Sequence, residues 1–165
     1  MIHPERIAHI VIKVRDLEKS QAFYTETLGM QVMKYVPEIK AVFLSFNGQD
    51  HHEVALFEIG QKAEAPKMNQ VGLLHVAFRM RNEEDLRAAY QELKEKNVNV
   101  TFTVNHGVTK SVYFHDPDGN ELEVYADNDI PELIGTMPNA YLGMEKLEFA
   151  PTDPSLQEML ASMRH

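Results

Sequence analysis

The sequence predicts an α+β protein in which a β-α-β-β-β module occurs twice in tandem. Two strand-like stretches, residues 8–15 and 74–81, align without a gap at an offset of 66 residues. Both stretches place a histidine, His9 or His75, at their second position, and the same order of helix and strand patterns follows each of them. We expect the two modules to form an open eight-stranded, barrel-like cleft, followed by a C-terminal tail with a short helix.

The first module begins with a strand predicted at residues 6–14. Asp16 is a typical N-cap residue for the helix that follows, and Gly29 is placed to end that helix in the left-handed region. Alternating apolar residues predict three further strands near residues 31–36, 41–46 and 51–58. The pair Asn47-Gly48 favours a hairpin turn between the last two strands.

The second module repeats this order from a strand at residues 72–80. Asn82 is the predicted N-cap of a helix with apolar residues at helical spacing, namely Leu86, Ala89, Tyr90 and Leu93. Further strands are predicted near residues 98–104, 110–115 and 120–126, with a tight turn at 116–119. We therefore expect one domain over residues 1–127, with modules at about 5–60 and 71–127, and a C-terminal extension over 128–165.

Composition restricts the classes of function. The 165 residues carry a formal charge of −9, which argues against nucleic-acid binding and against a polybasic membrane contact, because both need clustered Lys and Arg. No apolar run is long enough to cross a bilayer, and the N-terminus lacks the apolar stretch of a secretory signal, so we expect a cytoplasmic protein. The chain has no cysteine. Any metal must therefore be held by nitrogen and oxygen ligands.

Strand alternation predicts that His9, His75 and Glu123 share a common environment. Alternate side chains lie on opposite faces of a sheet, and in all three strands the face opposite these residues is apolar and fits under a helix. The three side chains would then point into the cleft. Two imidazoles and one carboxylate leave a divalent cation with open coordination positions, which suits iron(II). The same ligands could hold Mn(II), Ni(II) or Zn(II) as a Lewis acid.

The motifs around these residues resemble those of the vicinal oxygen chelate superfamily, which includes glyoxalase I, bleomycin-resistance proteins and type I extradiol dioxygenases. Residues 9–24 and 28–30 resemble its opening, and residues 113–123 resemble its closing signature. In that signature the carboxylate seven residues after the Asp of an Asp-Pro pair is a metal ligand, and here it is Glu123. The resemblance covers about residues 5–127 and does not by itself select a reaction.

Further motifs resemble the catechol 2,3-dioxygenase branch of this superfamily. That branch has a His-Gly pair followed, seven residues after the His, by a Tyr, and His106 and Tyr113 match this spacing. His52 corresponds to a further branch histidine at the start of a His-x-x-Ala stretch. The resemblance implies an extradiol dioxygenase of aromatic compound catabolism that uses Fe(II), a catechol-like substrate and O2, with catalytic roles for His52, His106 and Tyr113. Phe43 aligns with Tyr113 at an offset of 70 residues and would line the substrate pocket with His106 and Tyr113.

Two alternatives concern the same residues. Strict alternation directs His51 rather than His52 toward the cleft. The 70-residue offset also aligns Glu53 with Glu123, which would complete a four-ligand set resembling glyoxalase I, a Lewis-acid isomerase: His9, Glu53, His75 and Glu123. A third hypothesis is a non-catalytic protein that binds small aromatic molecules. Because open sheets leave strand edges to protect, we expect a homo-oligomer.

Overall fold

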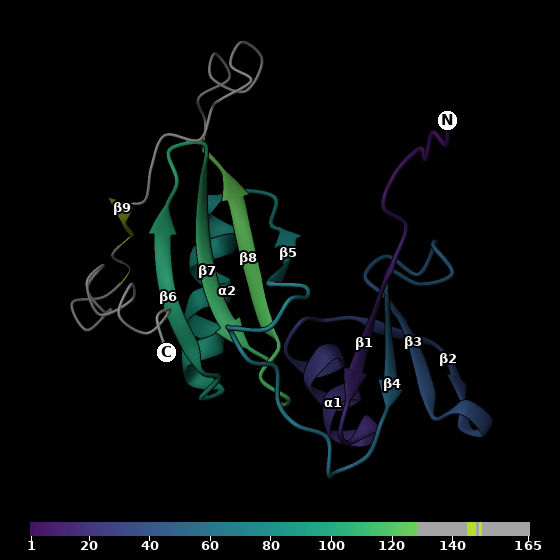
Figure 1. The fold of residues 1–165 in the computed structure, drawn as a ribbon. Helices are drawn as coiled ribbons and strands as arrows, with labels where there is room; N and C mark the ends of the chain where they lie inside the picture. The colour runs from purple at the N-terminus through teal and green to yellow at the C-terminus, as the bar shows by residue number, and fades with distance from the viewer. Residues whose placement is uncertain (129–144, 148, 150–165) are drawn as a thin grey trace. The chain divides into compact units, whose positions relative to one another are not determined.

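The computed structural model describes residues 1–128, 145–147 and 149. They form two compact units, the first over Met1–Ala65 and the second beginning at Pro66. Each unit has one mixed sheet with one α-helix packed against it (Figure 1). In the described ranges, we find no helix with the length and apolar character needed to span a bilayer.

The first unit contains a four-stranded sheet in the order β1-β4-β3-β2. Strand β1 is parallel to β4, and the other neighbours are antiparallel. In chain order its elements are β1 (Ile10–Val14), α1 (Leu17–Glu26), β2 (Gln31–Val36), a 3-10 turn (Pro37–Ile39), β3 (Ala41–Ser45) and β4 (Val54–Glu58). The predicted order of one helix and four strands is confirmed.

The second unit repeats this topology and adds a strand. Its sheet has the order β5-β8-β7-β6-β9, with β5 parallel to β8. In chain order its elements are β5 (His75–Arg79), α2 (Glu83–Glu95), β6 (Val100–Asn105), β7 (Thr109–His115), β8 (Glu121–Asp127) and β9 (Glu145–Lys146). Strand β9 pairs with β6 and was not predicted, because two residues carry no alternation pattern. The short helix predicted near residues 155–163 lies outside the described residues.

Local signals in the sequence set the ends of both helices. The Asp16 side chain accepts a hydrogen bond from the backbone N–H of Lys19 (3.0 Å), and that of Asn82 accepts one from Asp85 (2.8 Å). Both side chains therefore satisfy amides that have no partner within the helix, as predicted. Gly29 has φ +71°, the left-handed conformation expected after α1.

A tight turn fixes the start of β8. The backbone N–H of Gly119 donates to the carbonyl of Asp116 (3.1 Å), which closes the turn predicted at residues 116–119. The Asp116 carboxylate also accepts hydrogen bonds from the backbone N–H groups of Asp118 and Asn120, both at 2.9 Å. These bonds hold the two ends of the turn together, so the register of β8 against β7 is well defined.

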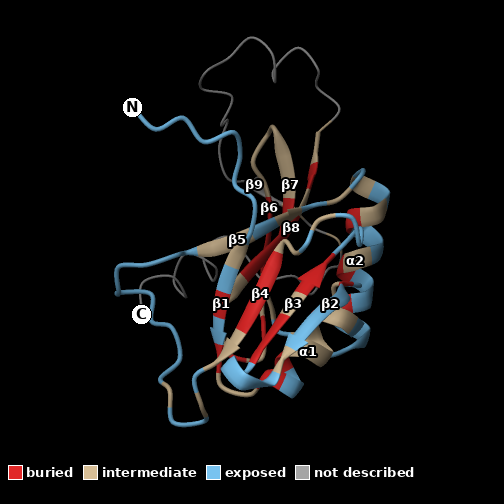
Figure 2. Ribbon diagram, turned by 90° about the vertical axis from the view of Figure 1, so that its right-hand side faces the viewer, coloured by how far each residue is buried: buried red, intermediate tan, exposed pale blue. Residues whose placement is uncertain are grey.

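Each sheet has one face covered by its helix and one face turned away from it. In β1, Val14 is 1% exposed on the helix side, whereas Val11 is 54% exposed on the other side. In the second unit the helix side is formed by apolar residues of β7, β8 and α2, namely Val112, Phe114, Leu122, Val124, Leu86, Tyr90 and Leu93. Figure 2 shows the buried residues of the first unit concentrated in β3 and β4. The predicted facing of the strands is confirmed, and we call the face away from each helix the open face.

Candidate functional site

His75 and Glu123 are neighbours on the open face of the second sheet. In the parallel pairing of β5 and β8, Glu123 lies opposite Ala77, two residues along the same face from His75. The distance from His75 Nε2 to Glu123 Oε2 is 3.1 Å. Glu123 is buried and His75 is partly exposed. An imidazole nitrogen is therefore in contact with a buried carboxylate.

Tyr113 and His106 extend this pair into a continuous polar network. Tyr113 lies directly opposite Glu123 in the pairing of β7 and β8. Burial raises the pKa of the Tyr113 phenol well above its usual value, and the charge of Glu123 and a hydrogen bond to it act in the same direction. His106 Nε2 lies 3.2 Å from the Tyr113 hydroxyl. On its other side Tyr113 is stacked on Phe102, with ring centroids 4.3 Å apart.

The turn between β6 and β7 holds His106 in place. The backbone N–H of His106 donates to the carbonyl of Thr109 (2.8 Å), and Gly107 adopts φ +86°. The Asn105 side chain accepts from the N–H of Gly107 (2.9 Å), and Asn128 donates to the Gly107 carbonyl (2.6 Å). Glycine is required at this turn because a side chain would be strained at such a φ value. The His-Gly pair therefore has a structural role beside its predicted chemical one.

His9 lies in the first unit and contacts two other histidines. It immediately precedes β1, and its ring centroid is 4.3 Å from that of His52 and 5.8 Å from that of His51. His52 also contacts Phe43 at 4.9 Å. Burial lowers the pKa of His52, and the nearby His9 and His51 lower it further. Of the two competing histidines, His52 is nearer to His9 and contacts the predicted pocket residue Phe43.

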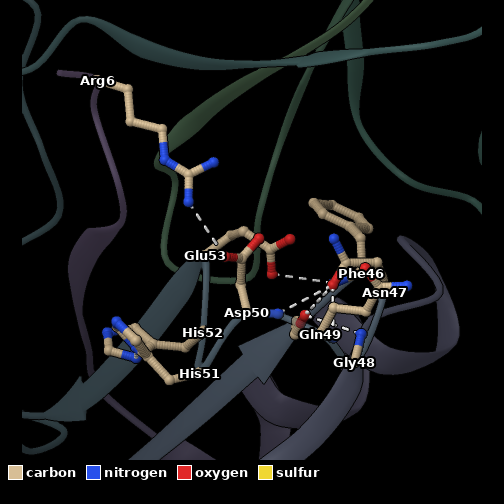
Figure 3. Close-up of polar contacts among 10 residues, drawn as sticks. Arg6, Phe46, Asn47, Gly48, Gln49, Asp50, His51, His52 and Glu53 are labelled. Carbon is tan, nitrogen blue, oxygen red and sulfur yellow. Dashed lines mark hydrogen bonds and ion pairs between the residues drawn. The ribbon is translucent and has the colours of Figure 1, made fainter.

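The connection at residues 46–53 explains why both rings reach His9. Strand β4 begins only at Val54, so strict alternation does not apply to residues 51 and 52. Asn47 accepts hydrogen bonds from the backbone N–H groups of Gln49 (2.7 Å) and Asp50 (3.2 Å), which bends the chain there. Figure 3 shows both histidine rings on one side of this connection. The predicted hairpin between these two strands is confirmed, because β3 and β4 are antiparallel neighbours, and its connection is a loop of eight residues, 46–53, that contains Asn47 and Gly48.

The register of the first sheet overturns the alignment of Glu53 with Glu123. Phe43 lies opposite Ala55, whereas its counterpart Tyr113 lies opposite Glu123. Ala55 therefore occupies the position of Glu123, and the 70-residue offset does not hold in β4. The Glu53 carboxylate instead accepts a hydrogen bond from the backbone N–H of Phe46 (3.2 Å), as Figure 3 shows.

The repeat equivalent of Glu53 is Glu121, two residues before Glu123. The backbone N–H of Ile10 donates to the Glu53 carbonyl, which places Glu53 beside His9 in the same way that Glu121 is paired with His75. Burial raises the pKa of Glu121, while nearby His115 and His75 act against this shift.

Comparison with known proteins identifies the family. The sequence model described as the Glyoxalase/Bleomycin resistance protein/Dioxygenase superfamily matches residues 6–124. The chain belongs to this superfamily. Its fold agrees with a solved member, the glyoxylase/bleomycin resistance protein/dioxygenase domain from Frankia sp. EAN1pec. That structure has a TM-score of 0.67 at 21% identity and covers 77% of this chain and 95% of its own.

Relatives in the superfamily have different activities. Biphenyl-2,3-diol 1,2-dioxygenase 3 from Rhodococcus globerulus is 36% identical over 126 residues, which are 74% of this chain and 64% of that protein. This chain thus spans less than two thirds of that dioxygenase. Lactoylglutathione lyase from Salmonella typhimurium is 28% identical over 138 residues, which are 79% of this chain and 98% of that protein. The superfamily includes dioxygenases and lyases, so membership alone does not select the reaction.

The predicted metal ligands of this superfamily member are divided between its units. His9 belongs to the first unit, and His75 and Glu123 belong to the second. Among the described residues, no group of three or more His, Cys, Asp or Glu side chains is arranged to hold a metal ion. The donor chemistry of the second unit nevertheless fits a divalent cation. Glu123 is a buried carboxylate that pairs with His75 and with no described Lys or Arg, and a bound cation would compensate its charge.

Proposed function

We propose that the protein is a metal-dependent extradiol dioxygenase that cleaves the ring of a catechol-like substrate with O2. The proposal rests above all on the contact between His106 and Tyr113, 3.2 Å apart and adjoining the His75–Glu123 pair. His106 can accept a proton and Tyr113 is a phenol, and both lie beside a pair of side chains of the kinds that bind metals. This combination suits a substrate that must release a proton as it binds. The similarity to the Rhodococcus dioxygenase supports the same activity.

In this proposal His9, His75 and Glu123 hold the metal, with Fe(II) preferred over Mn(II), Ni(II) and Zn(II). Two neutral imidazoles and one carboxylate leave positions open for further ligands, the arrangement known for iron(II) oxygenases. A bound iron(II) would supply the redox chemistry that allows O2 to react with an electron-rich catechol. The protein's own residues would bind the substrate, orient it and move its protons.

Each proposed catalytic residue has a distinct task. In this proposal His106 accepts a proton from a catechol hydroxyl, and Tyr113 donates a hydrogen bond to the substrate oxygen; the contact between the two side chains supports a joint role. His52, a residue of the first unit, is proposed to exchange a proton with the substrate. Phe43 contacts His52 and offers an apolar wall for the aromatic ring. The stacking of Tyr113 on Phe102 restricts the orientation of the phenol.

The glyoxalase-like alternative is less well supported by the first sheet. A four-ligand site would need a carboxylate at the position equivalent to Glu123, and Ala55 occupies it. The Glu53 carboxylate is engaged by the Phe46 amide. A non-catalytic aromatic-binding protein would have no need for a buried carboxylate paired with an imidazole. Both alternatives make different experimental predictions from the dioxygenase.

One experiment separates the three functions. Protein purified without oxygen is analysed for metal, and a catechol is then added in aerated buffer while O2 uptake and yellow colour are recorded. The dioxygenase requires a bound divalent metal, for which we expect iron, together with O2 consumption matched to substrate loss and a coloured ring-opened product. Turnover of a glutathione hemithioacetal without O2 would instead identify the isomerase. Aromatic binding that a chelator does not affect, without turnover, would identify the binding protein.

The ligand assignment has its own test with a matched control. Glu123→Gln removes a carboxylate from the proposed set, and Glu121→Gln removes the neighbouring carboxylate on the same face. We expect the first variant to lose most of its bound metal, because a neutral amide is a weaker ligand for a hard divalent cation, and the second to retain it. Equal metal content in the two variants would contradict the assignment of Glu123.

A further inference from the structure

The open face of the second sheet carries a second polar row beside the proposed metal ligands. The pairings of β5, β8 and β7 arrange side chains of this face in rows across the strands. The first row is His75, Glu121 and His115; the second is Ala77, Glu123 and Tyr113; the third is Arg79, Tyr125 and Ser111. Neighbouring rows are separated by two residues, which is about 7 Å along a strand. The third row, called here the Arg79 row, has no role in the proposed chemistry.

Arg79 is a cation on this face, and its ion-pair partner can be replaced. Its guanidinium pairs with the carboxylate of Asp127, and the two side chains are 66% and 31% exposed. An ion pair this exposed contributes little, because water already solvates both charges. A carboxylate arriving from solution can therefore replace Asp127 at low cost. Arginine suits this task because its planar fork binds carboxylates through two parallel hydrogen bonds.

Ser111, at the other end of the Arg79 row, has an unused hydrogen-bonding group. Its side-chain oxygen is fully buried and has no hydrogen-bond partner of acceptable geometry in the described structure. The hydroxyl is close enough to Tyr113 to lower the pKa of that phenol slightly, against the larger effect of burial. A buried hydroxyl without a partner is unfavourable unless a ligand or water satisfies it. Ser111 is thus a buried polar residue at one end of the Arg79 row, and Arg79 is the exposed cation at the other end.

The first unit repeats the cation at the equivalent position. Lys13 follows His9 by four residues on the open face of β1, just as Arg79 follows His75 on β5. Both lysine and arginine lie on the face that carries the proposed ligands, in a chain whose formal charge is −9. A cation therefore recurs at the same position of the repeat in both units, on the face that carries the proposed ligands.

We propose that Arg79 is a specificity-determining residue that binds an anionic substituent, a carboxylate, on the aromatic ring of the substrate. This inference rests on the proposed function, because it takes the substrate to be a catechol held beside Glu123. The Arg79 row lies about 7 Å from the Glu123 row, a distance that an aromatic ring with a short carboxyalkyl chain spans. The substrate class is thus a catechol with a carboxylate-bearing side chain.

The test compares two catechols that differ only in charge. One carries a short carboxyalkyl chain and the other is its methyl ester. We expect wild-type protein to have a higher kcat/KM for the acid than for the ester, and Arg79→Met to lower this ratio about fivefold, the effect of losing one exposed ion pair. The change should appear in KM, since Arg79 does not touch the reacting atoms. Arg79→Lys should keep part of the preference.

Two further variants sharpen the test. Arg81→Met is the matched control, because Arg81 lies two residues away, is highly exposed and pairs with Asp85 of α2 (2.8 Å). It should leave the ratio at the wild-type value. Asp127→Asn removes the competing carboxylate and should raise the ratio. Equal loss in Arg79→Met and Arg81→Met would overturn the proposal.

The outcomes separate this proposal from the proposed function. Cleavage of both catechols, with the same ratio in wild-type and Arg79→Met protein, rejects the role of Arg79 and leaves the dioxygenase intact. Cleavage of neither catechol rejects the dioxygenase. In that case dissociation constants of the acid and the ester, measured without O2, decide the role of Arg79. Weaker binding of the acid alone in Arg79→Met supports it, and equal effects on both ligands reject it.

Discussion

The residue that connects most of the candidate site is Tyr113. Its hydroxyl contacts His106, its ring is stacked on Phe102, and its strand places it directly opposite Glu123. Because β7 and β8 are antiparallel neighbours, the position of Tyr113 opposite Glu123 follows from sheet register, whereas the turn between β6 and β7 supplies His106. Removing the hydroxyl alone therefore leaves the packing in place and isolates its chemical role.

The variant Tyr113→Phe is expected to lower kcat/KM for the catechol about 100-fold, the usual size of one acid–base contribution. The free energy of unfolding should fall by only about 1 kcal/mol, because one buried hydrogen-bonding group is lost while the aromatic stack remains. Steady-state kinetics and urea denaturation measure the two effects. Tyr90→Phe, which removes a phenol hydroxyl on the helix side, should leave kcat/KM unchanged. A similar kinetic loss in both variants would show that the hydroxyl acts only through packing.

At the scale of the elements, short polar contacts determine where the helices and strands begin. The N-caps Asp16 and Asn82 start α1 and α2, and Asp116 closes the turn before β8. Each contact spans four residues or fewer, so each is readable from local sequence. One prediction tests what such a contact contributes to stability, and a second concerns a contact between elements of the first unit.

The N-cap of α2 is tested by Asn82→Ala. The side chain of Asn82 accepts a hydrogen bond from Asp85, and its loss is expected to lower the free energy of unfolding by about 1 kcal/mol. Asn82→Asp keeps an acceptor of the same shape and should retain most of the stability. Urea denaturation of the three proteins measures the difference. Equal destabilisation by alanine and aspartate would show that capping is not the cause.

We expect Glu58 to make the stability of the first unit sensitive to acid. A hydrogen bond from Lys40 (2.7 Å) and one from the backbone N–H of Leu17 (3.3 Å) lower the pKa of Glu58 below its ordinary value of 4.5. A depressed folded-state pKa gives stability that is present above the unfolded-state pKa and is lost as pH falls through the folded-state pKa. Wild-type protein should therefore lose stability more steeply below about pH 5 than Glu58→Gln.

Urea denaturation at a series of pH values measures this difference. Glu5→Gln is the control, because it removes an exposed carboxylate near the N-terminus and should leave the wild-type slope unchanged. Parallel pH curves for wild-type and Glu58→Gln protein would show that Glu58 contributes no acid sensitivity.

At the scale of the whole molecule, one proposal involves both units, namely that His9, His75 and Glu123 hold a metal. His9 belongs to the first unit and His75 and Glu123 to the second. A ligand that binds only the folded state stabilises it by mass action, by about 2.7 kcal/mol at a concentration 100 times its Kd. We expect Fe(II), added without O2, to raise the Tm of the wild-type protein. His9→Ala should lose most of this increase, whereas His3→Ala should keep it.

A full increase in Tm for His9→Ala would remove His9 from the ligand set. Binding of the metal by His75 and Glu123 alone would still agree with their contact in the second unit.

The expected homo-oligomer stays a prediction. Strand β2 is an edge of the first sheet and exposes apolar side chains, with Tyr35 at 54% and Val32 at 44%. Such an edge is the kind that a neighbouring chain can cover.

The sequence by itself determined the features that depend on near neighbours. The offset of 66 residues between His9 and His75 predicted the repeat, and alternation predicted which face of β5 carries His75. The resemblance to the catechol 2,3-dioxygenase branch singled out His106 and Tyr113, and in the second unit these two side chains are in contact. These features follow from the periodicity of strands and from caps and turns, whose physics acts over a few residues.

Only the tertiary structure decided the features that depend on pairing between distant segments. The alignment of Glu53 with Glu123 was wrong because the connection at residues 46–53 shifts the register, so that Ala55 lies opposite Phe43. The approach of His52 to His9 follows from the folding of that loop, and β9 gains its strand conformation by pairing with β6. Register between strands is set by loop geometry and by hydrogen bonds across the sheet, and no local pattern in the sequence encodes either.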